Sequence, residues 1–425
     1  MKRPGLYGSN KQIHQRILLS YAFQLSVGLI GLICVTAIPL WGVFFWQKMD
    51  RNTYNNLLGI IFAFTLTTFA IRRLLQFPGA VSVGYVLPTT SLTYGLLIVF
   101  YLLDRITYSN QIMLAGYFFT LAWCYLEYFI GNRYRTIRFA LVPFGDALQF
   151  SPAHGADFSV LKKPAFPHHR FNAVIADLHS PKLTPQWERF LAYSTLKGIP
   201  VYHSKQIKES LTGRVRIDHL SENVFGSLSP SVYYQTVKRF IDLTGALLLS
   251  VLLIPLFILT IVIIRIESKG PAFFLQPRMG YRGRTFTMIK FRSMYINKKG
   301  KKFTSESGDP RITKVGKFIR KFRVDELPQI FNIILGQMSF IGPRPESLEL
   351  SAWYEKEVPF FAYRHIVRPG ISGWAQVELG YAAEIEGMKQ KLEYDFYYIK
   401  NFSFWLDILI FFKTVRTVLT GFGAR

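Results

Sequence analysis

The chain has 425 residues, half of them hydrophobic and 16% aromatic, and a formal net charge of +25. This length allows two or three domains, and the charge indicates nucleic acid, anionic lipid or a phosphorylated substrate as a partner. Nucleic acid is disfavoured, because helix-turn-helix, zinc-ligand and RNA-binding signatures are missing and long apolar runs indicate a bilayer. Cys34 and Cys124 both lie within apolar runs, which argues against a disulfide framework or a cysteine zinc site.

The first 136 residues contain four apolar runs, each about as long as a helix needs to cross a bilayer core of about 30 Å. These runs are Ile17–Trp46, Tyr54–Ile71, Val81–Leu103 and Ile112–Ile130. Cations gather before the first run, after the second and after the fourth: Lys2, Arg3, Lys11, Arg16, Arg72, Arg73, Arg133, Arg135 and Arg138. The positive-inside rule therefore predicts four transmembrane helices, with the N-terminus and the segment after the fourth helix in the cytoplasm.

Residues 137–229 have the pattern of a small α/β domain. The apolar runs Phe139–Val142, Asn172–Asp177 and Ile199–Tyr202 are typical of buried parallel strands, and Thr184–Lys197 has the spacing of an amphipathic helix. This alternation predicts a Rossmann-like sheet. Because no Gly-x-Gly-x-x-Gly follows the first strand, we expect no bound dinucleotide, and a structural or assembly role is favoured over ligand sensing.

A fifth apolar run, Phe240–Ile264, contains Pro255 and has cations on both sides. Cations at both ends suit a helix near 238–266 that enters the cytoplasmic leaflet and returns, with the proline supplying the bend. An ordinary kinked transmembrane helix explains the composition equally well. Near the C-terminus, Phe402–Leu419 mixes large apolar residues with Lys413 and Arg416, as a helix lying in the membrane interface does.

The region after this run is strongly basic. Gln276–Gly283 is typical of a glycine-containing hairpin turn, and Phe286–Met294 of a strand that carries Lys290 and Arg292 on one face. A basic strand beside a glycine turn can hold a diphosphate, because glycine lets the backbone approach closely. A solvated edge strand protected by cations is the simpler alternative.

Two adjacent carboxylates, Asp325 and Glu326, follow in the most basic part of the chain. From Arg265 to Asp325 there are 17 Lys or Arg against 4 Asp or Glu. Such a field keeps carboxylates ionised and attracts phosphates, and Arg320 and Arg323 share one face of the preceding helix. One carboxylate can attack phosphorus while the other holds a divalent cation. An Asp at a helix start is otherwise often only an N-cap.

Three further residues are candidates on sequence grounds. Prolines on both sides restrict the backbone around Arg344, which preorganises its guanidinium for a phosphate, although a rigid surface turn is equally compatible. Arg368 begins a second such loop, Arg-Pro-Gly. Asp395 is a possible additional acid; the alternative is an ordinary Asp that caps a helix or forms a salt bridge.

Taken together, these motifs resemble the bacterial sugar transferase family, the monotopic phosphoglycosyl transferases. The likeness covers about residue 230 to residue 425 and rests on five motifs in order: Lys238–Asp242, Lys290–Met294, Asp325–Gln329, Gly342–Pro345 and Arg368–Gly370. Four N-terminal spans and a Rossmann-like insert resemble the large subgroup that includes undecaprenyl-phosphate galactose and glucose phosphotransferases. The resemblance implies a mainly helical catalytic domain on the cytoplasmic face of the bacterial inner membrane, and it favours the re-entrant helix.

The resemblance also implies a reaction: a sugar 1-phosphate passes from a UDP-sugar to undecaprenyl phosphate with release of UMP, initiating exopolysaccharide, capsule or lipopolysaccharide O-antigen synthesis. Asp325 would be the nucleophile of an aspartyl phosphosugar intermediate, and Glu326 would bind Mg²⁺. Lys290, Arg292, Arg320, Arg323, Arg344 and Arg368 would hold phosphates. Gln337 stands where the family commonly has Asp, which leaves a metal or folding role there open. The extra N-terminal half makes a homodimer an expectation.

Two other functions compete with this one. A carboxylate-dependent phosphohydrolase would use water as the acceptor, whereas a membrane-embedded helix favours a lipid acceptor. A scaffold that binds anionic lipid through its basic half would not need Asp325. The sequence alone does not name the sugar.

Overall fold

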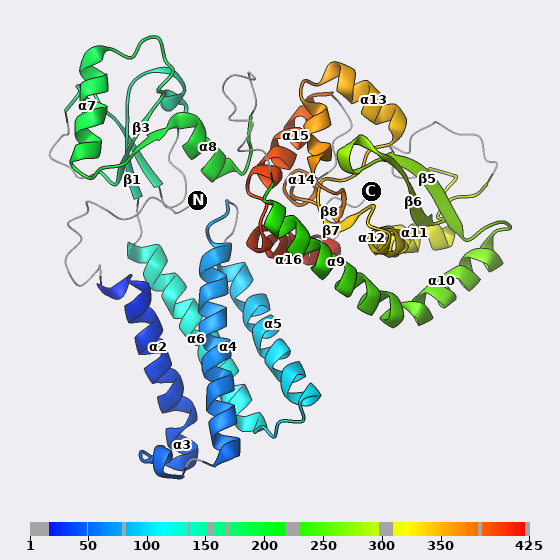
Figure 1. Cartoon of the computed structure of the whole chain (residues 1–425), viewed down its shortest axis with the longest axis horizontal. Helices are drawn as coiled ribbons and strands as arrows, with labels where there is room; N and C mark the ends of the chain where they lie inside the picture. The colour runs from blue at the N-terminus through cyan, green and yellow to red at the C-terminus, as the bar shows by residue number, and fades with distance from the viewer. Residues whose placement is uncertain are drawn as a thin grey trace. The chain divides into compact units, whose positions relative to one another are not determined.

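The computed structural model describes residues 17–48, 50–78, 82–134, 137–150, 156–165, 171–216, 230–296, 309–380 and 385–420. The chain divides into two compact units, Met1–Gly213 and Arg214–Arg425; Figure 1 colours the chain from one to the other. The N-terminal cations used for the orientation, Lys2, Arg3, Lys11 and Arg16, lie outside the described residues, as does Arg135.

The first unit begins with helices of the expected order. They are α2 (Tyr21–Thr36), α3 (Ile38–Trp41), the 3₁₀ turn η1 (Phe45–Lys48), α4 (Arg51–Leu74), α5 (Ser82–Leu103) and α6 (Asn110–Tyr134). Three of the four predicted spans, α4, α5 and α6, are long and apolar enough to cross a membrane. The first predicted span is divided: α2 has 16 residues and ends at Thr36, α3 follows from Ile38, and Gly42, with a positive φ of 77°, ends α3. With three helices of transmembrane length, this protein is a membrane protein.

Hydroxyl groups link these helices where their apolar faces meet. Thr67 of α4 lies 2.6 Å from Thr93 of α5, and Tyr94 lies 2.8 Å from Thr120 of α6. Interhelical hydrogen bonds of this kind stabilise membrane bundles, in which packing apolar side chains against each other gains little over lipid.

The same unit contains a four-stranded parallel sheet of order β2-β1-β3-β4. Figure 1 labels β1 and β3 of this sheet. Its strands are β1 (Ile137–Leu141), β2 (Ala156–Val160), β3 (Ala173–Ala176) and β4 (Val201–His203). α7 (Pro185–Leu196) packs on one face, while η2 (Gly145–Gln149) and α8 (Ser204–Thr212) pack on the other. The predicted parallel strands and helix are confirmed; β2, an exposed edge strand, was not predicted.

The second unit opens with α9 (Val232–Leu252) and α10 (Ile254–Glu267), which meet at a bend of 61°. Pro255 lies in the first turn of α10, where its missing N–H leaves no hydrogen bond unmade. Large apolar side chains such as Leu248, Leu252 and Ile258 are exposed along both helices. The bent pair is compatible with either a broken span or a re-entrant hairpin.

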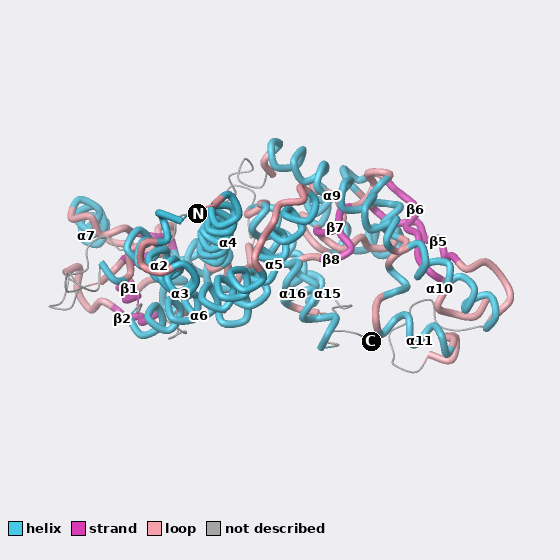
Figure 2. Tube along the Cα trace, turned by 90° about the horizontal axis from the view of Figure 1, so that it is seen from below, coloured by secondary structure: helices cyan, strands magenta, loops and turns pink. Residues whose placement is uncertain are grey.

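The remaining elements of this unit are short. The hairpin β5 (Phe273–Met279) and β6 (Thr285–Phe291), with η5 (Tyr281–Gly283) as its turn, confirms the predicted glycine hairpin. A second pair, β7 (Ser339–Ile341) and β8 (Gly370–Ser372), is parallel; Figure 2 shows the strands of both pairs in magenta. Helical segments complete it: α11 (Lys314–Lys321), η6 (Val324–Glu326), α12 (Gln329–Ile334), α13 (Leu348–Glu357), η7 (Phe361–Ile366), α14 (Trp374–Glu378), α15 (Ile385–Lys400) and α16 (Phe404–Thr420).

The pairing of β7 with β8 joins the two proline-arginine loops. A Cβ at Gly342 would lie 2.3 Å from the carbonyl oxygen of Arg368, and one at Gly370 would lie 2.1 Å from the Gly342 nitrogen. Only glycine allows backbones to approach this closely. The glycine of each loop is therefore explained by the contact with the other loop.

Candidate active site

The two adjacent carboxylates lie on η6, a single 3₁₀ turn between α11 and α12. Arg323 enters this turn in the left-handed conformation, with φ of 55°. Since α12 begins only at Gln329, after Pro328 as its N-cap, Asp325 does not cap that helix. The predicted helix start at Asp325 is therefore shifted to Gln329, and the N-cap interpretation of Asp325 is wrong.

Glu326 is buried at the centre of three cations. Arg344 Nη2 lies 2.6 Å from Glu326 Oε1, and Lys290 Nζ lies 3.3 Å from the same oxygen. Arg323 Nη1 approaches Oε2 at 3.7 Å. Burial works to raise the pKa of Glu326, but the charges of Arg344 and Lys290 outweigh it and hold the pKa below its ordinary value.

The pKa of Asp325 is shifted in the opposite direction to that of Glu326. Burial, reinforced by the charge of Glu326, raises the pKa of Asp325 to about 6, although Lys290, Arg320 and Arg344 work against the shift. Cations thus pair with Glu326, whereas Asp325 is a partly desolvated carboxylate that forms no ion pair with another described residue. A desolvated carboxylate whose pKa lies close to neutrality is typical of a reactive group.

One buried donor near this turn has no partner among the described residues. Arg320 is on α11, and its Nη1 is buried without a hydrogen bond, although its charge acts on Asp325. Buried guanidinium N–H groups are costly to leave unpaired. An anion placed beside Asp325 would satisfy this donor.

Arg278 also belongs to this charged region and was not predicted. It donates to the carbonyl of Pro345, next to Arg344, and to Gln276 Oε1, while its Nε is buried without a partner in the described structure. Arg278 follows Gln276 and Pro277 in the predicted hairpin, and for that reason it was interpreted as part of the turn.

Arg292 lies apart from the carboxylates. It is placed just after β6, and its Nη2 donates to the carbonyl and hydroxyl oxygens of Ser268 at 2.7 and 2.8 Å, while Nη1 donates to the carbonyl of Lys269. These contacts cap the C-terminal end of α10, where a cation is favoured. Arg292 therefore has a structural role at the end of α10, which was not predicted; the sequence predicted that it binds phosphate.

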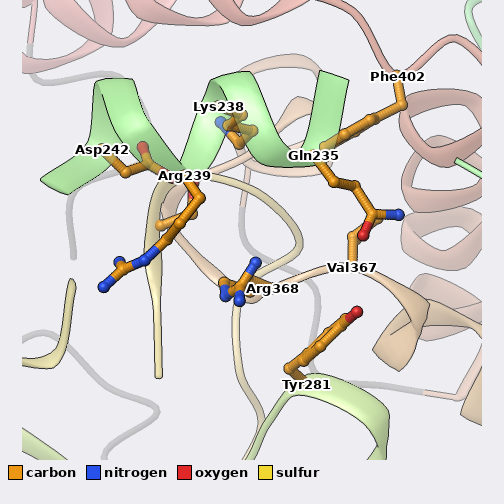
Figure 3. A pocket seen from close by; sticks show the side chains of 9 residues that line it. Gln235, Lys238, Arg239, Asp242, Tyr281, Val367, Arg368 and Phe402 are labelled. Carbon is orange, nitrogen blue, oxygen red and sulfur yellow. The ribbon is translucent and has the colours of Figure 1, made fainter. Parts of the chain in front are cut away.

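Arg368 and Arg239 line a small pocket beside α9, together with Tyr281 (Figure 3). Arg239 donates to the carbonyls of Ile333 and Ile334, and Arg368 Nε donates to that of Gly336 at 3.1 Å. Both arginines thus cap the C-terminal end of α12. Arg368 therefore lies in this pocket and is not among the cations that pair with Glu326.

Asp395 lies in a separate buried ion network. Its Oδ2 is 2.9 Å from Arg364 Nη2, and both side chains are 1% exposed. Glu346 pairs with Lys391 and with Arg364 in the same network. The arrangement favours the ion-paired alternative that the sequence left open.

Gln337 has a defined contact. Its Oε1 accepts a hydrogen bond from Asn332 Nδ2 at 2.7 Å, and Asn332 also bonds to the backbone of β6 at Thr287 and Ile289. Gln337 therefore helps to fix α12 against the hairpin.

Comparison with known proteins places this geometry in a family. Residues 233–421, which include η6 and all its cationic partners, match the model of the bacterial sugar transferases. A UDP-N-acetylgalactosamine-undecaprenyl-phosphate N-acetylgalactosaminephosphotransferase of Aeromonas hydrophila is 48% identical over 97% of this chain and 98% of its own length. The chain belongs to the bacterial sugar transferase family. Its motifs were therefore identified correctly from the sequence.

Other relatives share only part of this transferase. The UDP-glucose:undecaprenyl-phosphate glucose-1-phosphate transferases of Xanthomonas campestris pv. campestris and Escherichia coli are 40% and 39% identical, over 46% and 42% of the chain and 41% and 39% of their own lengths. The Aeromonas protein, by contrast, is similar to the transferase in both units.

Proposed function

We propose that the transferase moves a sugar 1-phosphate from a UDP-sugar to undecaprenyl phosphate and releases UMP. The observation that carries the proposal is the contrast at η6, where Glu326 has three cationic partners and Asp325 is left desolvated with a pKa of about 6. A diphosphate fits this cluster, since the charges of Lys290, Arg320 and Arg344 also act on the reactive carboxylate, Asp325. The A. hydrophila relative supports UDP-N-acetylgalactosamine as the first donor to test.

In the proposed reaction, an Asp325 carboxylate oxygen attacks the phosphorus that carries the sugar. The bond between this phosphorus and the oxygen that bridges to the uridine phosphate breaks, and UMP leaves with the electron pair. An oxygen of undecaprenyl phosphate then attacks the same phosphorus, which frees the Asp325 carboxylate and forms the lipid diphosphate sugar. Arg320, Arg323, Arg344 and Lys290 hold phosphate oxygens through both steps.

Magnesium is part of the proposal, with Glu326 as the ligand. Glu326 Oε1 receives the short contact from Arg344, whereas Oε2 has only longer ones, 3.4 Å from Arg344 Nη1 and 3.7 Å from Arg323. Oε2 thus keeps a lone pair for a hard cation, and Mg²⁺ commonly needs only one or two carboxylates beside substrate phosphates and water. When bound, the ion would neutralise diphosphate charge.

The deciding experiment measures UMP release by the full chain in detergent, with a panel of UDP-sugars, Mg²⁺ and undecaprenyl phosphate. Asp325→Asn is run beside Glu355→Gln, which alters an exposed carboxylate of the same unit. We expect lipid-dependent UMP from one sugar, abolished only by Asp325→Asn. Equal UMP without lipid would favour a phosphohydrolase, and no UMP from folded protein would favour a lipid-binding scaffold.

The proposal includes a topology: four N-terminal spans in the inner membrane, a cytoplasmic Rossmann-like domain and a re-entrant α9–α10 hairpin below a cytoplasmic catalytic domain. The 61° bend allows the hairpin as well as a broken span, and the cations at both ends of the pair favour the hairpin. With Cys34 and Cys124 replaced by alanine, cysteines at the exposed positions Tyr233 and Lys269 should react with an impermeant reagent from the same membrane face. Reaction from opposite faces would show a broken span.

The pathway and assembly complete the proposal. The lipid-linked sugar would initiate exopolysaccharide, capsule or O-antigen synthesis, and the extra N-terminal half supports a homodimer. Mass measurement of the detergent-solubilised chain tests the dimer directly.

A further inference from the structure

Three side chains outside the catalytic unit converge at the edge of the parallel sheet. Asp177 and His179 follow β3, and His203 ends β4. One possible ligand atom from each side chain lies within 4.8 Å of the other two. Among the described residues, this is the group of three His, Cys, Asp or Glu side chains close enough to share one metal ion. The group has no part in the reaction proposed above.

The distances suit a cation of the zinc class. His179 Nδ1 lies 2.8 Å from His203 Nε2, which lies 3.8 Å from Asp177 Oδ1. Metal–ligand bonds of about 2.0–2.1 Å in a tetrahedron put neighbouring ligand atoms about 3.3 Å apart, between these two values. Two imidazoles and one carboxylate are ligands that zinc and similar transition metals accept, and three protein ligands leave one coordination position open.

The fold holds one ligand in place before any cation arrives. Asp177 Oδ2 accepts a hydrogen bond from the Asp146 nitrogen, and Oδ1 accepts one from the His179 nitrogen. A Cβ at Gly145, whose φ is +56°, would lie 2.0 Å from Asp177 Oδ2, so the loop after β1 closes on this carboxylate only with glycine there. Each oxygen accepts one backbone donor and keeps lone-pair capacity for a metal.

The strand order gives an independent reason to expect a ligand here. In the order β2-β1-β3-β4, the chain leaves β1 toward β2 on one side and returns to β3 on the other. In open parallel sheets, ligands bind outside the carboxyl ends of the strands at this switch point. Asp146 follows β1 and Asp177 follows β3, so the group lies at that position.

We propose that Asp177, His179 and His203 bind one zinc-class divalent cation. Without a cation, the His203 ring carries its proton on Nε2, because Nδ1 accepts a hydrogen bond from the Lys205 nitrogen at 3.0 Å. Coordination through Nε2 moves that proton to Nδ1 and releases the Lys205 contact. The cation thus replaces one helix-cap hydrogen bond with a link between the loops after β3 and β4.

The test uses the full chain in detergent, purified with a tag that lacks histidine. Co²⁺ is titrated and followed by its visible absorption, and Zn²⁺ is then added to displace it. We expect one ion per chain and at least a tenfold loss of affinity in His179→Ala and in His203→Asn, which keeps an acceptor for Lys205. Asp157→Asn, an exposed carboxylate of the same sheet, should bind as the unmodified protein does.

The readout does not involve transfer activity, so it can fail or succeed independently of the proposed reaction. Absence of stoichiometric Co²⁺ and Zn²⁺ binding by folded protein would overturn the site. Unchanged affinity in both histidine variants would also overturn it, since the metal would then be bound elsewhere.

Discussion

Arg344 Nη2 lies 2.6 Å from Glu326 Oε1, which joins the loop after β7 to the turn before α12. This contact brings two sequence motifs, Asp-Glu and Pro-Arg-Pro, into one charged cluster. Glu326 is only 6% exposed, and a buried ion that loses its partner is costly, at about 3–5 kcal/mol. The pair therefore serves both the fold and the proposed site.

Replacing Arg344 tests both roles. Arg344→Ala should lower the free energy of unfolding by about 3 kcal/mol and kcat/KM for the UDP-sugar by about 100-fold or more. Arg344→Lys keeps the charge but loses the planar fork, so we expect a smaller loss of about tenfold. Lys317→Ala, an exposed cation on α11, serves as the control. Full activity in Arg344→Ala would remove this arginine from the site.

Asp325 predicts a pH effect on activity. A nucleophile must be ionised, and burial raises the pKa of Asp325 to about 6. The kcat/KM for the UDP-sugar should therefore fall about tenfold for each pH unit below 6 and level off above it, because kcat/KM reports the pKa of the substrate-free enzyme. Steady-state kinetics between pH 5 and 8, at UDP-sugar concentrations below KM, measures this profile. A profile that stays flat down to pH 5 would contradict the shifted pKa.

The same carboxylate predicts a gain in stability when its charge is removed. The folded pKa of about 6 exceeds the ordinary 3.8, so folded protein binds a proton more readily, and stability falls as pH rises from about 4 to 6. At pH 7 the ionised group costs the fold up to about 3 kcal/mol. Asp325→Asn should thus melt at a higher temperature at pH 7 while losing activity. Equal melting temperatures of the two proteins at pH 7 would exclude this cost of burying the ionised carboxylate.

Arg292 is predicted to affect stability more than substrate binding. Arg292→Lys cannot reproduce the contacts with both oxygens of Ser268, so we expect the unfolding free energy to fall by about 1–3 kcal/mol. KM for the UDP-sugar should stay within about twofold. Thermal unfolding in detergent and kinetics on the folded fraction measure the two effects. A tenfold rise in KM at unchanged stability would restore the phosphate role.

Arg292 also illustrates what the sequence could predict. The hairpin, the dyad and the order of motifs follow from residue types and spacing. Lys290 lies on β6, the predicted strand, but its contact with Glu326 was not predicted. Arg292 lies two residues after Lys290, beyond the end of β6, and it donates to the carbonyls at the C-terminal end of α10. Those carbonyls are distant in sequence, so charge and periodicity could not identify them as its partners.

The metal-binding group shows the same limit in another form. Asp177 was included in a predicted strand, but His203 lies 24 residues beyond His179, and no ligand motif spans that interval. Only the register of β3 with β4 places them together. Short-range patterns therefore predicted the sheet, and the sheet, once formed, determined which side chains meet.

Asp395 provides the last prediction, because it separates a proton-transfer role from a positioning role. The contacts run in series: Asp395 pairs with Arg364 at 2.9 Å, and Arg364 Nη2 donates to the Arg344 carbonyl at 2.8 Å. Asp395→Asn removes the closer of the two carboxylate charges that balance buried Arg364, so we expect about 3–5 kcal/mol of destabilisation. Because Arg344 is held by this series, kcat should also fall.

A positioning role leaves the pH profile of the remaining activity unchanged, with its acid limb still near 6, because Asp325 still sets it. Glu386→Gln, an exposed carboxylate on the same helix α15, should alter neither stability nor rate. If Asp395→Asn instead removed a limb of the pH profile in protein of normal stability, the side chain would transfer a proton in the reaction. The burial of both partners at 1% exposure argues for the positioning role, since a carboxylate buried from solvent has no exposed route for the proton.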